Sequence, residues 1–370
     1  MRTDVFCRVV DNYGDIGVCW RLARRLAHGR GWPVRLWVDD LAAFQRIQPN
    51  VQPGLAQQLV AGIEIVRWTP QPDPALLTPA EVVIEAFACD PPADYVAAMR
   101  RTQPVWINLE YLSADSWVES CHGLPSRRPD GLTKHFFFPG FTPATGGLLR
   151  EPGLSAQRDA LQACRGLQQD FLRTLGLGQN ELGLVEQDAR LVTLFCYPHA
   201  PWAELAAALA KDASRTLLLA PQGVAPGIEA AVPPGGRLHV ARVPFVVQDD
   251  FDRLLWCADI NFVRGEDSFV RAAWAARPLV WQIYPQDEDT HLEKLGAWQA
   301  RYAAPEAAQT LVRAWNADAS AVPRALARAL AAPTWQAWRQ SARQWDADLA
   351  QHPDLADNLA DFCAELARTR

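Results

Sequence analysis

Lysine is nearly absent from this chain, which carries only Lys134, Lys211 and Lys294 among its 370 residues. Arginine therefore supplies most of the positive charge, but Lys+Arg total 36 against 42 Asp+Glu, which leaves a net charge of −6. A chain with this balance lacks the overall positive potential that drives nonspecific binding to nucleic acid. We therefore expect no nucleic-acid partner.

Other absences narrow the class of protein further. No segment approaches the roughly 20 consecutive apolar residues that span a bilayer, and no apolar signal core precedes the first predicted strand. The 8 cysteines form no C-x-x-C pair, which argues against a zinc site or a disulfide framework. We expect a cytoplasmic protein with buried free thiols and no membrane contact.

The composition and the hydrophobic patterns of the chain indicate two α/β domains. Hydrophobic residues make up 49% of the chain and charged residues 21%, as in soluble globular proteins, and 370 residues fit two domains of about 150–200 residues each. Apolar, β-branched strand patterns alternate with helical patterns in both halves. In the first half the predicted strands cover 5–10, 34–40, 63–68, 82–87, 105–111 and a segment from 134. In the second half they cover 190–198, 215–221, 237–244, 258–263 and 278–283.

This alternation predicts two mostly parallel sheets with helices on their faces, followed by an almost wholly helical stretch after Pro305. Two such domains in series suggest facing lobes, with a ligand between them at the carboxyl ends of the strands. The layout is typical of a GT-B glycosyltransferase, although a fold alone does not determine the chemistry.

The loop DNYGDIG joins the first predicted strand to the first helix and carries Asp11, Gly14, Asp15 and Gly17. It has neither the G-x-G-x-x-G spacing of a dinucleotide site nor the G-K-[ST] of a Walker loop. Two carboxylates would repel a phosphate, so they are better suited to accept a proton or to hold a cationic group. The structural alternative is that Asp15 caps the helix and Asp11 ends the strand in a turn.

A second polar segment, RGEDS, follows the strand pattern that ends at Val263. Arg264 can offset phosphate charge, the start of a helix exposes backbone N–H groups, and Ser268 adds a hydroxyl. Glu266 is placed to accept from a sugar hydroxyl. The structural alternative is that Asp267 or Ser268 caps the helix and that Glu266 is simply solvated.

Just upstream, Phe245 and Phe251 flank Gln248, and an amide between two aromatic rings could read and stack on a pyrimidine base. Both phenylalanines could equally be ordinary core residues. The acidic runs at 248–250 and 287–289 resemble the acidic pairs of metal-dependent transferases, but we interpret them as solvated turns and helix caps.

The segments FCRVVDNYGDIGVCWRLARRLA and NFVRGEDSFVRAAWAARPLVWQIYPQDEDTHLEKL closely resemble the bacterial EF-P arginine rhamnosyltransferases, the EarP family. The resemblance extends over essentially the full chain. It implies a GT-B fold with two Rossmann-like domains: an acceptor-binding domain at 1–175 that holds the catalytic acids, and a nucleotide-sugar domain at 185–350. Residues 351–370 would form a terminal helix packed back on the first domain.

The resemblance also implies the reaction and its residues. Members transfer L-rhamnose from dTDP-β-L-rhamnose to an arginine of elongation factor P, with inversion and without a metal or other cofactor. Asp15 and Asp11 match the family's acidic positions. The donor-binding residues would be Tyr13, Gly14, Tyr197, Phe245, Gln248, Phe251, Arg264, Glu266, Asp267, Ser268 and Tyr284.

Because a guanidinium stays protonated at neutral pH, we expect Asp15 to accept its proton only as the C–N bond forms, while Asp11 orients the group. The two roles could be reversed. The competing hypotheses are a GT-B transferase with a different acceptor and a non-catalytic nucleotide-binding regulator.

Overall fold

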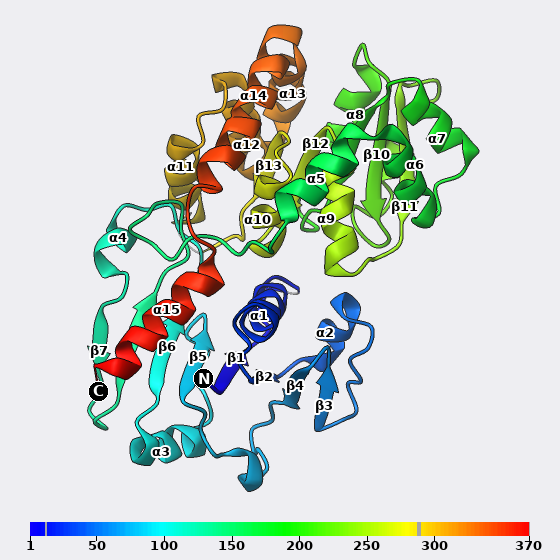
Figure 1. The fold of residues 1–370 in the computed structure, drawn as a ribbon. Coiled ribbons are helices and arrows are strands. Elements are labelled where there is room, and N and C mark those ends of the chain that lie inside the picture. Colours follow the sequence, from blue (N-terminus) through cyan, green and yellow to red (C-terminus); the bar gives the residue numbers. More distant parts are fainter. Residues whose placement is uncertain (12, 287–289, 370) are drawn as a thin grey trace. The chain divides into compact units, whose positions relative to one another are not determined.

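The computed structural model describes residues 1–11, 13–286 and 290–369, and its chain divides into two compact units (Figure 1). The first unit comprises Met1–Pro152 and Leu349–Arg370, and the second comprises Gly153–Asp348. Each unit has its own β-sheet and its own hydrophobic core. The acidic run at 287–289 lies outside the described residues.

The sheet of the first unit has eight strands among the described residues, in the order β3-β4-β2-β1-β5-β6-β8-β7. The central six are parallel, whereas β3 and β7 pair antiparallel at the two edges. The strands are β1 (Thr3–Cys7), β2 (Val34–Val38), β3 (Gln57–Val60), β4 (Ile63–Arg67), β5 (Val82–Ala86), β6 (Val105–Leu109), β7 (Pro125–Arg127) and β8 (Thr133–Phe137). The helical segments are α1 (Gly14–Arg24), η1 (Arg25–Gly29), α2 (Leu41–Ile47), η2 (Pro74–Leu76), α3 (Ala93–Thr102), α4 (Trp117–Cys121) and α15 (Leu355–Arg368).

The central strands β1, β5 and β6 are buried at every position, because helices cover both faces of a parallel sheet. Phe6, Trp37 and Trp106 point to the face covered by α3, where they pack against Tyr95 and Met99. The chain runs outward from β1 through β2 to β4 and then returns to the other side of β1 as β5. The sheet therefore has its topological switch point between β1 and β5, the place where parallel sheets bind ligands.

The C-terminal helix α15 belongs to the first unit (Figure 1). Arg25 donates two hydrogen bonds to Asp354, of 3.1 and 2.9 Å, and Asn358 donates to the carbonyl of Gly146 at 3.0 Å. Asp354 also accepts from the backbone of Arg150 and caps α15. These contacts join the last part of the chain to the first domain.

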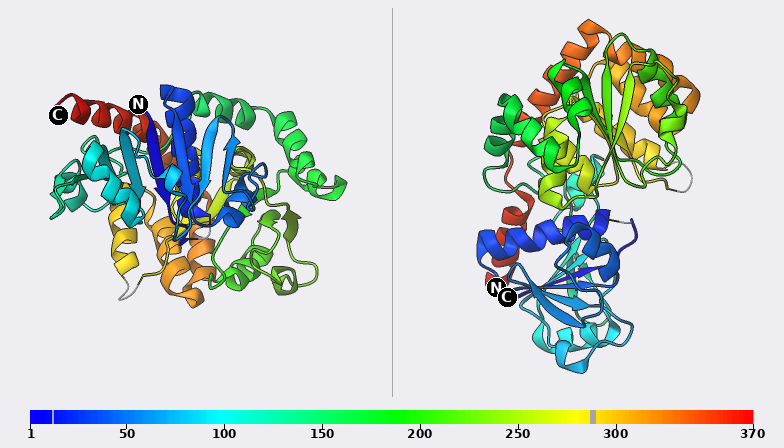
Figure 2. Two further views of the ribbon diagram at one scale, coloured as in Figure 1. Left: turned by 90° about the horizontal axis from the view of Figure 1, so that it is seen from below. Right: turned by 90° about the vertical axis from the view of Figure 1, so that its right-hand side faces the viewer.

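The second unit has a five-stranded parallel sheet among its described residues, in the order β11-β10-β9-β12-β13, with helices on both faces (Figure 2). Its strands are β9 (Arg190–Leu194), β10 (Thr216–Pro221), β11 (Leu238–Val243), β12 (Ile260–Arg264) and β13 (Leu279–Gln282). Its helical segments are α5 (Leu154–Ala163), α6 (Arg165–Thr174), α7 (Gln179–Glu186), α8 (Trp202–Lys211), η3 (Ile228–Ala231), α9 (Gln248–Cys257), α10 (Asp267–Trp274), α11 (Thr290–Arg301), α12 (Glu306–Ala317), η5 (Ala319–Ala321), α13 (Val322–Leu330) and α14 (Ala332–Leu349), whose last residue already lies in the first unit.

The boundary between the units corrects the sequence-based assignment of 1–175 to the first domain. Residues 153–175, which form α5 and α6, belong to the second unit. Phe171 and Leu172 enter its core, and Arg158 donates to Asp346 at 2.5 Å and to the carbonyl of Trp274 at 2.8 Å. Burial of these side chains decides the assignment, and the local helical pattern does not reveal which sheet a helix covers.

The cysteines are all free, as expected, and six of them are buried. Cys164 is exposed and Cys121 is partly buried, so the expectation of buried thiols is wrong for these two. Within the described residues, every helix is too short or too polar to cross a lipid bilayer.

Candidate active site

The acidic loop of the first unit lies just beyond the carboxyl end of β1, at the switch point of its sheet. The Asp15 side chain is only 2% exposed, and its Oδ2 accepts the backbone N–H groups of Val10 and Asp11, both at 2.8 Å. Its Oδ1 accepts the Tyr111 hydroxyl at 3.3 Å. Asp15 therefore holds the preceding loop in place through Oδ2, while Oδ1 contacts the Tyr111 hydroxyl.

The alternative in which Asp15 caps the helix is wrong. Helix α1 begins at Gly14, and its N-cap residue is Tyr13, whose side chain makes no capping hydrogen bond. Asp15 reaches backward to the loop instead of forward to the helix N–H groups. The expectation that Asp11 ends the strand in a turn is confirmed only for the turn: its carbonyl accepts the Gly14 N–H at 2.7 Å, but β1 already ends at Cys7.

Gly14 allows the Asp11 carboxylate to approach the start of α1 closely. A Cβ at this position would lie 2.9 Å from Oδ2 of Asp11, too near for an undisturbed carboxylate. The glycine thus lets the half-buried Asp11 side chain lie against the start of α1. The structure therefore identifies the Asp11 carboxylate as the group that a larger residue at position 14 would displace.

The electrostatics of Asp15 suit a proton acceptor. Burial raises the pKa of the Asp15 carboxyl and the charge of Asp11 adds to this rise, while the two backbone N–H groups and the Tyr111 hydroxyl oppose it. The net result is a pKa above the ordinary aspartate value. A carboxylate with a raised pKa is a stronger base than one in water.

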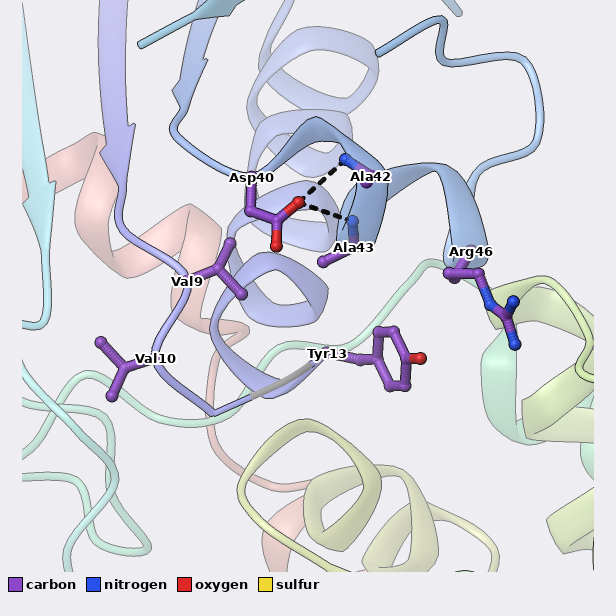
Figure 3. Close-up of a pocket in the computed structure, with 7 residues that line it drawn as sticks. All are labelled: Val9, Val10, Tyr13, Asp40, Ala42, Ala43 and Arg46. Carbon is purple, nitrogen blue, oxygen red and sulfur yellow. Dashed lines mark hydrogen bonds between the residues drawn. The ribbon is translucent and has the colours of Figure 1, made fainter. Parts of the chain in front are cut away.

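A pocket of about 510 Å³ adjoins this loop in the first unit (Figure 3). Asp40 caps α2 by accepting the N–H groups of Ala42 and Ala43, both at 2.9 Å, and this fixes one wall. Figure 3 shows Tyr13 and Arg46 together on one side of the pocket. The complete lining is Val9, Val10, Tyr13, Asp40, Ala42, Ala43 and Arg46.

In the second unit, Arg264 ends β12 and lies between two aromatic rings. Its guanidinium carbon is 4.6 Å from the ring centre of Phe195 and 4.8 Å from that of Tyr197, and Nη1 donates to the carbonyl of Cys196 at 3.3 Å. Stacking of this kind holds the planar group in one orientation while leaving its charge in place. Arg264 is therefore a preorganised cation at the carboxyl end of the sheet.

The turn after Arg264 has the predicted form. Gly265 has a left-handed φ of +60°, and helix α10 begins at Asp267. The N-cap residue is Glu266, whose side chain makes no capping hydrogen bond, and Asp267 and Ser268 lie inside the helix, so the alternative of an Asp267 or Ser268 cap is wrong. The buried Ser268 hydroxyl donates to the carbonyl of Arg264, so in this conformation its only proton is not directed at an anion.

Several of the other predicted donor-binding residues are close to one another. Gln248 begins α9 and donates to Asp267 at 3.5 Å, which links the start of α9 to the RGEDS segment. Tyr197 contacts the exposed ring of Tyr284 edge to face, with ring centres 5.7 Å apart. Phe245 is half-buried in the segment between β11 and α9.

Sequence reasoning missed three aromatic residues at these sites. Phe195 packs edge to face against Phe251, with centres 5.4 Å apart, and also stacks on Arg264. Its position two residues before Tyr197 at the end of β9 was the available signal, since alternate residues share a face. Phe87 and Tyr111 similarly follow the carboxyl ends of β5 and β6.

Among the described residues, no three histidine, cysteine, aspartate or glutamate side chains are grouped closely enough to hold a metal ion. The expectation that the reaction needs no metal stays a prediction. The acidic run at 248–250 forms the first turn of α9.

Two Rossmann-like units, one with acidic residues after its first strand and one with a stacked arginine beside a helix start, have the architecture of the GT-B fold, the fold of many glycosyltransferases. A crystal structure of MurG from Acinetobacter baumannii shares this fold at 12% identity, with a TM-score of 0.57 over 99% of this chain and 100% of that one. A structure described as the structural basis for EarP-mediated arginine glycosylation of translation elongation factor EF-P is 36% identical, with a TM-score of 0.65 over 99% of both chains.

The particular family follows from the sequence comparisons. The family described as Elongation-Factor P (EF-P) rhamnosyltransferase EarP matches residues 3–364. Protein-arginine rhamnosyltransferases from Pseudomonas putida and Pseudomonas aeruginosa are 48% and 45% identical, over 97% and 98% of both chains respectively. The chain belongs to the EF-P rhamnosyltransferase EarP family, and it is an enzyme.

Proposed function

We propose that this chain transfers L-rhamnose from dTDP-β-L-rhamnose to an arginine side chain of elongation factor P, with inversion at the anomeric carbon. Family membership supports the acceptor and the sugar. The observation that carries the chemistry is the buried Asp15 carboxylate, held by two backbone N–H groups at the switch point of the first sheet. A cationic acceptor suits this acidic loop, and a phosphate does not.

In the proposed reaction, a guanidinium nitrogen attacks the anomeric carbon while the bond from that carbon to the β-phosphate oxygen breaks. The bonding electron pair leaves with dTDP, and the nitrogen proton passes to Asp15 as the C–N bond forms. The raised pKa of Asp15 favours this transfer. Asp11 would pair with the guanidinium and orient it toward the anomeric carbon. The two reacting groups would then already be held in place, which lowers the entropic part of the barrier.

The second unit would bind the donor. Arg264, fixed between Phe195 and Tyr197, would stabilise the charge that develops on the departing diphosphate. Backbone N–H groups at the start of α10 would bind the same anion. Phe251 and Gln248 would contact the thymine base, and Glu266 would accept from a sugar hydroxyl.

The test is the intact mass of purified EF-P after incubation with this protein and dTDP-β-L-rhamnose. A gain of one deoxyhexose on an arginine is the expected product, and an α-linked anomer by NMR would establish inversion. An unmodified EF-P mass would refute the proposal. We also propose that the enzyme acts in the cytoplasm without a metal or cofactor, so transfer should persist in excess EDTA.

A further inference from the structure

Two aromatic side chains stack beside the proposed base in the first unit. The rings of Phe87 and Tyr111 are 4.2 Å apart between centres and 14° from parallel. Phe87 directly follows β5 and Tyr111 comes two residues after β6, so both lie at the carboxyl edge of the sheet. Tyr111 is 41% exposed, which is high for an aromatic ring that packs against another.

The backbone that carries Phe87 has an uncommon conformation. Phe87 and Ala88 have left-handed φ values of +59° and +53°, a region that side-chain-bearing residues rarely adopt. The buried Asn108 side chain accepts the Ala88 N–H at 3.0 Å, and the Phe87 N–H donates to the carbonyl of Leu109 at 2.7 Å. Conformations of this kind persist where the surroundings enforce them, and they concentrate at functional sites.

The hydroxyl of Tyr111 connects this pair to the acid, because it donates to Oδ1 of Asp15 at 3.3 Å. The aromatic surface and the carboxylate are therefore adjacent. A guanidinium is the group that can use both, since it hydrogen-bonds to carboxylates in its plane and stacks on aromatic rings with its face. The second unit shows the same preference, with Arg264 held between Phe195 and Tyr197.

We propose that the Phe87–Tyr111 pair is the platform on which the acceptor guanidinium lies, and that the Tyr111 hydroxyl positions the Asp15 carboxylate beside it. This inference rests on the proposed function, and it assigns two residues that the acidic motif does not include. Phe87 supports the Tyr111 ring by stacking on it. The left-handed backbone at Phe87 and Ala88 fixes the position of the Phe87 ring.

The two roles of Tyr111 are separable by substitution. Tyr111→Phe keeps the ring and removes the hydroxyl, whereas Tyr111→Leu removes both. Initial rates are measured with EF-P and dTDP-β-L-rhamnose by mass spectrometry, with each substrate varied in turn and the pH varied at saturation. Thermal unfolding of every variant monitors folding.

For Tyr111→Phe, we expect kcat to fall about 3- to 10-fold with KM for EF-P unchanged. The acid limb of the kcat–pH profile should move to higher pH, because the lost hydroxyl no longer stabilises the charged form of Asp15. A merely structural role of Tyr111 would not move this limb. An acid limb at the wild-type pH would overturn the positioning role.

For Tyr111→Leu, KM for EF-P should rise about 2- to 30-fold, the range expected for a lost cation–π contact, while KM for the donor stays unchanged. Phe87→Leu should raise KM for EF-P without moving the pH limb. The matched control is Trp117→Leu, which removes another exposed aromatic ring of the first unit, 54% exposed, and should leave both KM values unchanged.

A folded Tyr111→Leu protein with the wild-type KM for EF-P would overturn the platform while leaving the proposed function intact. An equal rise in KM for EF-P in the Trp117→Leu control would also overturn it, because the effect would then not be local to the site. A wild-type enzyme that adds no deoxyhexose to EF-P would refute the proposed function and this inference together.

Discussion

Replacing Asp15 by asparagine separates the chemical role of this residue from its structural role. Oδ2 of Asp15 accepts the N–H groups of Val10 and Asp11 at 2.8 Å, and the amide oxygen of asparagine can accept both in the same position. Asparagine has the same shape, and the Tyr111 hydroxyl can rotate to accept from its amide group. The loop should therefore keep its conformation while losing the group that takes the proton.

The expected kinetic loss is about 10²- to 10⁴-fold in kcat, the usual contribution of a general base. Affinity for the donor should stay the same, because the residues proposed to bind most of the donor belong to the second unit. Calorimetry with dTDP-β-L-rhamnose and mass-based transfer assays measure the two quantities separately. Asp11→Asn is the matched control: if Asp11 orients the guanidinium, its main effect should be a higher KM for EF-P.

The same substitution has a predictable effect on stability. Because the folded-state pKa of Asp15 is raised, the folded protein binds this proton more tightly than the unfolded chain does. The free energy of unfolding therefore decreases as pH rises from the ordinary aspartate pKa through the raised one. Asp15→Asn removes that loss, so at neutral pH its melting temperature should equal or exceed that of the wild type.

Near-normal turnover of Asp15→Asn would refute the assignment of Asp15 as the base. A melting temperature well below that of the wild type at neutral pH would refute the electrostatic part of the reasoning. If Asp11→Asn, and not Asp15→Asn, lowered kcat by about 10²- to 10⁴-fold, then Asp11 would be the base and Asp15 the orienting residue.

Three other substitutions test further parts of the structure. Gly14→Ala should lower kcat/KM about 10- to 100-fold, since its Cβ would lie 2.9 Å from Oδ2 of Asp11 and displace that carboxylate; steady-state kinetics measure this. Asp354→Ala should lower the free energy of unfolding by about 3–5 kcal/mol in urea denaturation, because it leaves the buried Arg25 without its main partner. Arg264→Lys should weaken donor binding about 10-fold by calorimetry, because an ammonium cannot keep the stacked, forked geometry; unchanged affinity would contradict that role.

The strand pattern of the chain is well determined by its sequence. All eleven predicted strands are present in the structure, because buried parallel strands need continuous apolar, β-branched runs and these are easy to recognise. The missed strands are β3 and β7, short edge strands with mostly exposed side chains that carry little apolar signal. The boundary at 152 was also missed, since the long-range contacts of Arg158 decide it.

The sequence by itself also identified the two polar segments, because an unusual cluster of residue types in a strand–helix loop is a local feature. It could not say what Asp15 contacts: the helix cap that local rules favoured is absent, and the carboxylate holds the preceding loop instead. It could not indicate Phe195, Phe87 or Tyr111 either, because their partners are brought near only by strand pairing.

Local composition therefore determined the fold class, the strand order along the chain and the positions of both polar segments. Tertiary structure decided which groups face one another. Tyr111 lies 96 positions along the chain from Asp15 yet donates to it, and Arg264 at the end of β12 contacts two rings that follow β9. The raised pKa of Asp15 is likewise a consequence of burial. Solvent exclusion and long-range contacts exist only in the folded chain. They turn two acidic residues, Asp11 before α1 and Asp15 in its first turn, into a candidate catalytic site.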